Sequence, residues 1–433
     1  MIDYCIWGFG KEGQASYQYL SRLYPNASIA VLTDVFDAKV AQLFTDKQYF
    51  YADGGLDLLA QGHFKTIVKS PGISLYRDEL VQAKLNGSLV TSSTNLWFQR
   101  FPDAKKIIVT GTKGKSTTAT LLHYCLSLFG MDLCLAGNLG TPLIDVEPGK
   151  DWTILELSSY QLADLTESAD ISILLNLFPE HIPWHKSVEQ YYLDKTHSLK
   201  LSSSIICNGQ SQLVSQYLVD VTDKTTHFDT PNGFNVKDHQ LYYKEDLLQH
   251  NFTLKGDHNL ANLVCVLTLL DQLKLSWRSI LMKLADFEAL PHRMELFVDA
   301  NGIEFINDSI STTPESTKCA IECLANTKLF LLLGGAERQQ NYLELLSYLE
   351  TLDIGHIALI GVTGKRINDY LISVNSKLNF AYYDRLKDAC VSIQKLVKPG
   401  EKVLLSPAAP SFGEFDNFQQ RGDAFLLHAG FSR

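Results

Sequence analysis

Short runs of aliphatic and β-branched residues alternate along the chain with longer stretches of mixed polar and apolar character. The first such runs lie at 4–7, 28–32 and 66–68, and each is followed within two residues by glycine, serine or threonine. Runs of this length that end at turn residues predict buried strands, and strands that alternate with helical stretches predict a doubly wound parallel sheet. The pattern therefore predicts a small Rossmann-like α/β unit in residues 1–92.

A glycine-rich loop follows the apolar run at 107–109 and leads into a predicted helix. Glycines at 111 and 114 allow the backbone N–H groups to turn toward an anion, and the following helix N-terminus adds its dipole. Lys115 supplies a positive charge and Ser116 offers a hydroxyl to Mg²⁺. A simple glycine turn with solvated lysines is the alternative, but the buried strand before the loop favours a nucleoside triphosphate site. Its predicted residues are Gly111, Thr112, Lys113, Gly114, Lys115, Ser116 and Thr117.

The alternation of apolar runs and helical stretches continues to the end of the chain. The runs are 152–155, 171–175 and 204–207, then 303–306, 328–333, 356–360 and 402–405. A chain of 433 residues is expected to form about three domains. We predict an α/β protein with a Rossmann-like domain over 1–92, a central phosphate-loop ATPase-like parallel-sheet domain over 93–293, and a Rossmann-like α/β domain over 294–433.

Composition and charge exclude several classes of partner. The chain is 45% hydrophobic and 20% charged, as in ordinary globular proteins, and its net charge is −10. Such a field repels polyanions, so nucleic acid and anionic membranes are not expected as partners. No apolar run reaches about 18 residues and no signal segment is recognisable, so we expect a cytoplasmic protein without membrane insertion, acting as a monomer.

Eight cysteines are scattered along the chain without a C-x-x-C pair. This usage is typical of reduced core thiols in a cytosolic protein. Cys319 and Cys323 are one helical turn apart, so they either share a buried face, which we favour, or ligate a metal.

Gly8, Gly10 and Gly13 follow the first predicted strand and open a predicted helix. With Asp34 about 20 residues further on, this spacing is the dinucleotide fingerprint and taken alone predicts NAD. The alternative is that the glycines only permit close packing of strand and helix.

Polar side chains follow the strands of the central unit. Glu156 comes directly after a buried run and is placed to bind Mg²⁺ through oxygen, unless it caps a helix. His181 follows the next run, where a structural role and a ligand role are equally favoured, and His185 has the weaker case. Lys195 lies on a helical stretch and would ordinarily be a solvated lysine.

Three further residues are candidates for nucleotide contacts. Asn259 and Asn262 are three apart, so both amides face one direction and can contact an adenine edge or cap the helix. Arg293, in a predicted hinge at 290–293, is available for a phosphate, with an interdomain salt bridge as the alternative.

A set of segments, in this order and spacing, resembles the Mur ligases of peptidoglycan synthesis. They are GTKGKSTT at 111–118, ELSS at 156–159, NLFPEH at 176–181, GDHNLAN at 256–262, LPHR at 290–293, NDS at 307–309 and LSPA at 405–408. The resemblance covers essentially the whole chain. It implies an ATP-dependent amide ligase that adds glutamate to UDP-N-acetylmuramoyl-L-alanine through an acyl phosphate.

The resemblance also implies a role for each domain and for individual residues. The first domain binds UDP rather than NAD, the second binds ATP, and the third binds the incoming amino acid. Implied substrate contacts are Gly8, Phe9, Gly10, Lys11, Thr33, Asp34, Ser70, Pro71, Gly72, Asn138, Ser158, Gln161, Thr312, Arg338, Ser411 and Phe418. Implied ATP contacts outside the loop are Asn259, Asn262, Arg293 and Asp308.

By the same resemblance, Lys115, Lys195 and His181 are catalytic and two Mg²⁺ ions are bound. The implied metal ligands are Ser116, Glu156, His181 and a carbamylated Lys195.

The chain departs from the family pattern at the amino-acid site. Ile310 and Arg338 stand where the usual D-glutamate enzyme has lysines, and the run at 313–316 resembles a divergent subgroup that takes L-glutamate. We expect D-glutamate as the substrate on family grounds, with L-glutamate as the alternative. Another Mur-type ligase, a non-catalytic nucleotide-sugar sensor and an NAD dehydrogenase are the remaining readings of the sequence.

Overall fold

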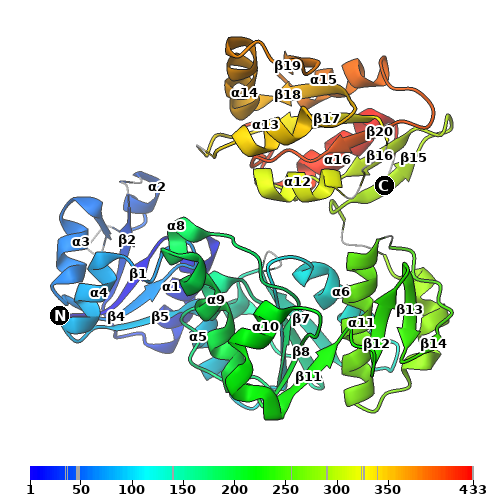
Figure 1. Cartoon of the computed structure of the whole chain (residues 1–433). Coiled ribbons are helices and arrows are strands. Elements are labelled where there is room, and N and C mark those ends of the chain that lie inside the picture. The colour runs from blue at the N-terminus through cyan, green and yellow to red at the C-terminus, as the bar shows by residue number, and fades with distance from the viewer. Residues whose placement is uncertain are drawn as a thin grey trace. The chain divides into compact units, whose positions relative to one another are not determined.

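The computed structural model describes residues 1–431 except 35, 37, 45–48, 139–140, 255, 289–290, 323, 325–326 and 339. Leu290 and Cys323, both named above, lie outside the described residues. The chain forms two compact units, residues 1–287 and 288–433. Parallel sheets flanked by helices occur in both units (Figure 1), which confirms the predicted α/β class. The predicted division at residues 92 and 293 stays a prediction.

The first sheet is parallel, with strand order β3-β2-β1-β4-β5. Its strands are β1 (Ile2–Trp7), β2 (Ile29–Thr33), β3 (Tyr49–Tyr51), β4 (Phe64–Lys69) and β5 (Leu89–Ser92). Its helices are α1 (Lys11–Leu23), α2 (Ala38–Ala41), α3 (Ala52–Ala60), α4 (Asp78–Leu85) and α5 (Ser93–Arg100). The chain moves outward from β1 in both directions, so the strand order switches between β1 and β4. Ligands of open α/β sheets bind at such a switch, outside the carboxyl ends of the strands.

The second sheet is also parallel, with order β11-β10-β9-β6-β8-β7. Its strands are β6 (Lys106–Thr110), β7 (Leu133–Gly137), β8 (Trp152–Glu156), β9 (Ile171–Leu174), β10 (Ser204–Asn208) and β11 (Thr225–Phe228). Its helices are α6 (Lys115–Ser127), α7 (Ser159–Leu162), α8 (Ile182–His185), α9 (Val188–His197), α10 (Gln212–Tyr217) and α11 (Asp257–Gln272). Apolar side chains of α6 and α11 pack on one face of this sheet, and those of α5, α7 and α9 belong to a second core.

A small antiparallel sheet precedes α11 and was not predicted from the sequence. It consists of β12 (Phe234–Lys237), β13 (Gln240–Tyr243) and β14 (Asp246–Leu247). Phe234 makes an edge contact with Trp277, with ring centroids 4.8 Å apart, and Tyr243 makes a tilted contact with the same ring. This sheet therefore covers the end of the α6 and α11 core.

The second unit contains one mixed sheet with order β15-β16-β20-β17-β18-β19. Its strands are β15 (Glu295–Val298), β16 (Glu304–Asn307), β17 (Leu329–Gly334), β18 (Ile354–Ile360), β19 (Phe380–Tyr383) and β20 (Lys402–Leu405). Its helices are α12 (Pro314–Glu322), α13 (Leu343–Leu349), α14 (Gly361–Ser373), α15 (Leu386–Gln394) and α16 (Phe418–Ala429). Only the edge strand β15 pairs antiparallel, with β16. Among the described residues, no helix is long and apolar enough to cross a membrane.

Candidate active site

The predicted phosphate loop begins where β6 ends and leads directly into α6. Gly111 has φ 154° and Gly114 has φ 85°, which are left-handed conformations that L side chains rarely adopt. A Cβ on Gly111 would lie 2.9 Å from the Cβ of Leu175, and one on Gly114 would lie 2.7 Å from Oδ1 of Asn262. Both positions therefore require glycine, as the loop pattern predicted.

Asn176, at the carboxyl end of β9, holds the loop in shape. Its Oδ1 accepts a hydrogen bond of 2.8 Å from the Lys113 N–H, and its Nδ2 donates to the Lys113 carbonyl at 3.0 Å. Its own carbonyl accepts the Thr112 N–H at 3.0 Å. The sequence analysis gave this residue no role, although its place after a buried run was the available signal.

Two lysines converge on one carbonyl of the loop. Nζ of Lys115 donates to the Gly111 carbonyl at 3.0 Å and to the Thr112 carbonyl at 2.9 Å. Nζ of Lys195 also donates to the Gly111 carbonyl, at 3.0 Å. Burial lowers the pKa of Lys195 well below its ordinary value, and the charge of Lys115 lowers it further. Lys195 is therefore not the solvated lysine that its helical context suggests.

The predicted metal ligands gather around this loop. Glu156 is buried at the end of β8 and pairs in register with Val109 of β6, and its charge acts on Lys195. Ser116 is buried in the first turn of α6. His181 has a left-handed φ of 58° and precedes α8. Within the described part of the chain, no three His, Cys, Asp or Glu side chains form a metal-binding group, so the mixed ligand set stays a prediction.

Glu180 adds a charge that the sequence analysis did not assign. Its Oε1 forms an ion pair with Nζ of Lys113 at 2.9 Å, and its Oε2 lies 3.7 Å from Nε2 of His181. Burial raises the pKa of Glu180, but the neighbouring positive charges, with Lys113 first, lower it overall. The loop lysine and the histidine are thus joined through one carboxylate.

The two amides predicted to contact the nucleotide lie on one side of α11. Nδ2 of Asn262 donates to Oδ1 of Asn259 at 3.5 Å. Oδ1 of Asn262 borders Gly114 of the phosphate loop. The N-terminal part of α11 therefore adjoins the loop, as a role at the nucleotide requires.

The glycine loop after β1 meets the loop after β4 at the strand switch. The Ser70 hydroxyl donates to the Gly8 carbonyl at 3.0 Å, and a Cβ on Gly13 would lie only 2.0 Å from that carbonyl. No heavy atom lies within 4 Å of a Cβ built on Gly10. Gly13 therefore serves helix packing, which was the alternative reading, while Gly10 borders open space. The predicted UDP contacts Phe9, Lys11, Pro71 and Gly72 follow the carboxyl ends of β1 and β4.

The polar residues after β2 are held by neighbours. Oδ1 of Asp34 pairs with Nη1 of Arg77 at 2.8 Å and accepts the Trp7 indole N–H at 3.2 Å. The Thr33 hydroxyl lies 2.8 Å from the Tyr49 hydroxyl. These contacts fix both side chains at the same edge as the Gly8 loop.

Ser158 and Gln161 form a capping box at the start of α7. The Gln161 Oε1 accepts both the N–H and the hydroxyl of Ser158, at 3.0 and 2.9 Å. The Asn138 N–H donates to the Glu156 carbonyl at 2.8 Å. The S-x-x-Q spacing was a sequence signal for this cap, and the implied muramoyl contacts of these residues stay predictions.

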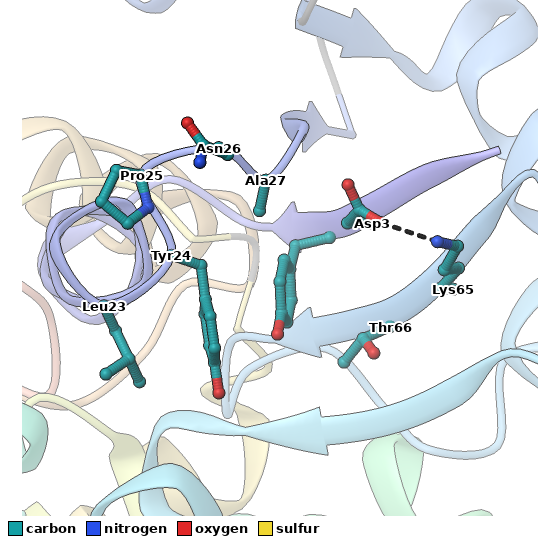
Figure 2. A pocket seen from close by; sticks show the side chains of 9 residues that line it. Asp3, Leu23, Tyr24, Pro25, Asn26, Ala27, Lys65 and Thr66 are labelled. Atoms are coloured by element: carbon teal, nitrogen blue, oxygen red, sulfur yellow. Dashed lines mark hydrogen bonds and ion pairs between the residues drawn. The ribbon is translucent and has the colours of Figure 1, made fainter.

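An open hollow of about 500 Å³ lies at the other edge of the first sheet. Figure 2 shows it between Asp3, Tyr24 and Lys65, with Lys65 paired to Asp3 at 2.8 Å. These residues lie near the amino ends of β1 and β4, whereas the predicted UDP contacts follow the carboxyl ends. The hollow is therefore not the predicted substrate site.

In the second unit, loops after three adjacent strands come together. The Ala408 N–H donates to the Ser311 carbonyl at 3.0 Å, and the Ala336 N–H donates to the Pro410 carbonyl at 2.8 Å. Thr312, Arg338 and Ser411 lie on these loops, so the fold brings the predicted amino-acid contacts to one sheet edge. Arg338 is exposed, and Ser411 is buried.

Arg421 of α16 forms hydrogen bonds with two of the loops at this sheet edge. No role was predicted for it from the sequence. The buried guanidinium donates to the Ser309 hydroxyl at 3.0 Å, the Ser309 carbonyl at 2.8 Å and the Ala409 carbonyl at 2.9 Å. Burial lowers its pKa to about 9. The Ser309 hydroxyl in turn donates to the carbonyl of Phe418, a predicted contact, at 2.7 Å.

Asp308 and Arg293 lie together at the start of the second unit. Asp308 is 2% exposed, and its Oδ2 accepts the Ser406 hydroxyl at 2.8 Å. Burial raises the pKa of Asp308 to about 6, against the effect of the hydroxyls and of Arg293. Both residues stay predicted ATP contacts.

Comparison with known proteins shows the family to which this chain is similar. Residues 109–270 match the model "Mur ligase middle domain", and residues 292–409 match "Mur ligase, glutamate ligase domain". A Xanthomonas axonopodis pv. citri protein named UDP-N-acetylmuramoyl-L-alanine–L-glutamate ligase is 32% identical, over 98% of this chain and 94% of its own. A Salinispora tropica protein of the same name is 33% identical, over 97% of this chain and 95% of its own.

Solved structures share the fold. MurC from Thermotoga maritima, a UDP-N-acetylmuramate–alanine ligase, aligns with TM-score 0.59 at 15% identity over 99% of both chains. MurF from Thermotoga maritima in complex with ADP aligns with TM-score 0.59 at 17% identity, over 99% of this chain and 94% of that one.

The family models and the relatives show that the chain is an ATP-dependent amide ligase. The chain belongs to the Mur ligase family.

Proposed function

We propose that this enzyme joins L-glutamate to UDP-N-acetylmuramoyl-L-alanine with hydrolysis of ATP to ADP and phosphate, in the cytoplasmic stage of peptidoglycan synthesis. The observation that carries the proposal is the match, over 98% of this chain, to relatives named for that reaction. The sequence expectation placed D-glutamate first, and the relatives favour its alternative. The isoleucine at 310 and the exposed Arg338 accord with a different arrangement of the amino-acid site.

The phosphate loop fits ATP for a physical reason. Its two glycines allow the left-handed turns that bring the loop close to Leu175 and Asn262, and its N–H groups precede the dipole of α6. Lys115 donates to the loop carbonyls and can turn toward a terminal phosphate when ATP is bound. Asn259 and Asn262 lie beside the loop on α11.

The donor set also fits Mg²⁺, which prefers oxygen ligands. Ser116 and Glu156 would hold one ion, and His181 with a carbamylated Lys195 would hold a second. Bound Mg²⁺ supplies charge neutralisation at the phosphates. Burial lowers the pKa of the Lys195 amine well below its ordinary value, which favours the neutral form that reacts with CO₂.

The chemistry follows in two steps. A carboxylate oxygen of the alanyl group attacks the γ-phosphorus of ATP, ADP leaves, and an acyl phosphate forms, while Lys115 compensates the developing charge. The glutamate amine then attacks the acyl carbon, phosphate leaves, and the nitrogen loses a proton as the amide forms.

The test is ADP release by the purified protein with ATP, Mg²⁺, UDP-N-acetylmuramoyl-L-alanine and either enantiomer of glutamate. We expect release and a product one glutamyl residue heavier with L-glutamate, and neither with D-glutamate. The opposite preference would restore the D-glutamate expectation, and no product with either enantiomer would refute the proposed substrate.

A further inference from the structure

A hydrogen-bond network, buried around His185, joins two segments of the first unit that follow strands of different sheets. One is the loop at 70–76 after β4, which carries predicted UDP contacts. The other is the segment at 181–195, which carries His181 and Lys195. The network consists of Pro71, Ser74, Tyr76, Ser159, Trp184, His185 and Asp194.

Trp184 makes the first link between the loops. Its indole N–H donates to the Pro71 carbonyl at 3.1 Å, and its own carbonyl accepts the Ser74 hydroxyl at 2.5 Å. Its ring stacks on Tyr160 with centroids 4.8 Å apart, and Nζ of the buried Lys69 lies 5.4 Å from the ring centroid. Both the side chain and the backbone carbonyl of Trp184 therefore form hydrogen bonds with the 70–76 loop.

Asp194 makes the second link. Its Oδ1 accepts the Tyr76 hydroxyl at 2.5 Å and the Gln190 amide at 2.8 Å. Its Oδ2 lies 2.5 Å from Nδ1 of His185. The next residue along α9 is Lys195, whose Nζ reaches the Gly111 carbonyl of the phosphate loop.

His185 completes the network, although a ligand role was less favoured for it than for His181 on sequence grounds. The Asp194 carboxylate accepts at both oxygens, so Nδ1 of His185 is the donor to it, and Nε2 lies at hydrogen-bonding distance, 3.0 Å, from the Ser159 hydroxyl. The imidazole is fully buried. It thereby ties α9 to α7, which begins three residues after Glu156.

A second contact supports the same junction. Nζ of Lys69, the last residue of β4, lies 3.3 Å from Oδ2 of Asp164, and both side chains are buried. A buried ion pair has one preferred geometry, since breaking it leaves an uncompensated charge.

We propose that Tyr76, Trp184 and the His185–Asp194 pair are positioning residues, which align the UDP-linked substrate held by the 70–76 loop with the phosphate loop and Lys195. The proposal rests on the proposed function. Since the links end on the 70–76 loop, weakening them disturbs the UDP-linked substrate and leaves ATP binding unchanged.

The test uses Tyr76→Phe and Trp184→Phe, each of which removes one donor and keeps an aromatic ring. A hydrogen bond to a carboxylate is strong, so for Tyr76→Phe we expect the KM for UDP-N-acetylmuramoyl-L-alanine to rise about tenfold or more. We expect the KM for ATP to stay within about twofold and Trp184→Phe to act in the same direction. Tyr24→Phe is the matched control, because Tyr24 stacks on Tyr4 and lines the hollow near the amino ends of β1 and β4 (Figure 2).

Hydrogen exchange provides a readout that does not depend on the substrate. We expect faster amide exchange at 70–76 in Tyr76→Phe, with unchanged exchange at 111–118 and an unchanged profile in Tyr24→Phe. Equal rises in both KM values, no rise in either, or unchanged exchange at 70–76 would overturn the positioning role. Absence of ligation by the wild-type protein would instead refute the proposed function and the substrate named here.

Discussion

Replacing Gly114 with alanine tests why the phosphate loop contains glycine. At φ 85° an alanine occupies a left-handed conformation, at a cost of roughly 1–2 kcal/mol. Its methyl group would lie 2.7 Å from Oδ1 of Asn262. Turning that amide off its rotamer adds about 0.5–1.5 kcal/mol. We therefore expect Gly114→Ala to lower the free energy of unfolding by about 1.5–3.5 kcal/mol.

Gly130 offers a matched control after the end of the same helix, α6. Its φ is 71°, and no heavy atom lies within 4 Å of an added Cβ. Gly130→Ala should therefore show the left-handed cost alone, about 1–2 kcal/mol, with ATP affinity unchanged. Gly114→Ala should also lose ATP affinity, because the displaced Asn262 and the altered loop backbone both adjoin the nucleotide.

Urea unfolding measures the stability of both variants, and calorimetry with ATP measures their affinity. Equal losses of stability in Gly114→Ala and Gly130→Ala would show that the Asn262 amide moves away from the added methyl group at no cost in free energy. Wild-type ATP affinity in Gly114→Ala would refute the assignment of this loop to the phosphates.

Three further predictions concern single side chains. Lys195→Ala should lose most ligase activity and regain part of it with added acetate, and unchanged activity would exclude carbamylation as a requirement. Arg338→Ala should raise the KM for glutamate far more than that for ATP, and equal rises in steady-state assays would remove Arg338 from the amino-acid site. The pKa of Asp308 is raised to about 6, so the folded state retains a proton that the unfolded chain releases above about pH 4. The free energy of unfolding of the second unit should therefore fall by roughly 2 kcal/mol as pH rises from 4 to 6, and denaturant titrations of Asp308→Asn should show no such fall.

The central strands and the phosphate loop could be predicted because their signals are local. The runs that became β6, β8 and β9 are buried on both faces, so they are continuously apolar in the sequence. The strands that were missed are short and mostly at sheet edges, such as β3 and β19, where each residue is only partly buried or exposed. Partial burial leaves no continuous apolar run to detect.

The environment of the site residues depended on tertiary packing. Lys195 resembles a solvated lysine in the sequence, but α9 turns it inward against the phosphate loop. His185, at the end of α8, is likewise turned inward, against α7. The Asp34 partner, Arg77, is distant in sequence, as are the carbonyls that Arg421 reaches. No spacing rule identifies such pairs. The position of the site could therefore be predicted from the sequence, but the contacts that support it could not.

The most direct test follows one oxygen atom through the reaction. UDP-N-acetylmuramoyl-L-alanine labelled with ¹⁸O in the alanyl carboxylate is incubated with the enzyme, ATP, Mg²⁺ and L-glutamate. The account predicts one ¹⁸O atom in each phosphate released and a product that gains one glutamyl residue. Product without label in the phosphate would contradict the acyl phosphate, and phosphate release without any glutamyl product would contradict the ligase itself.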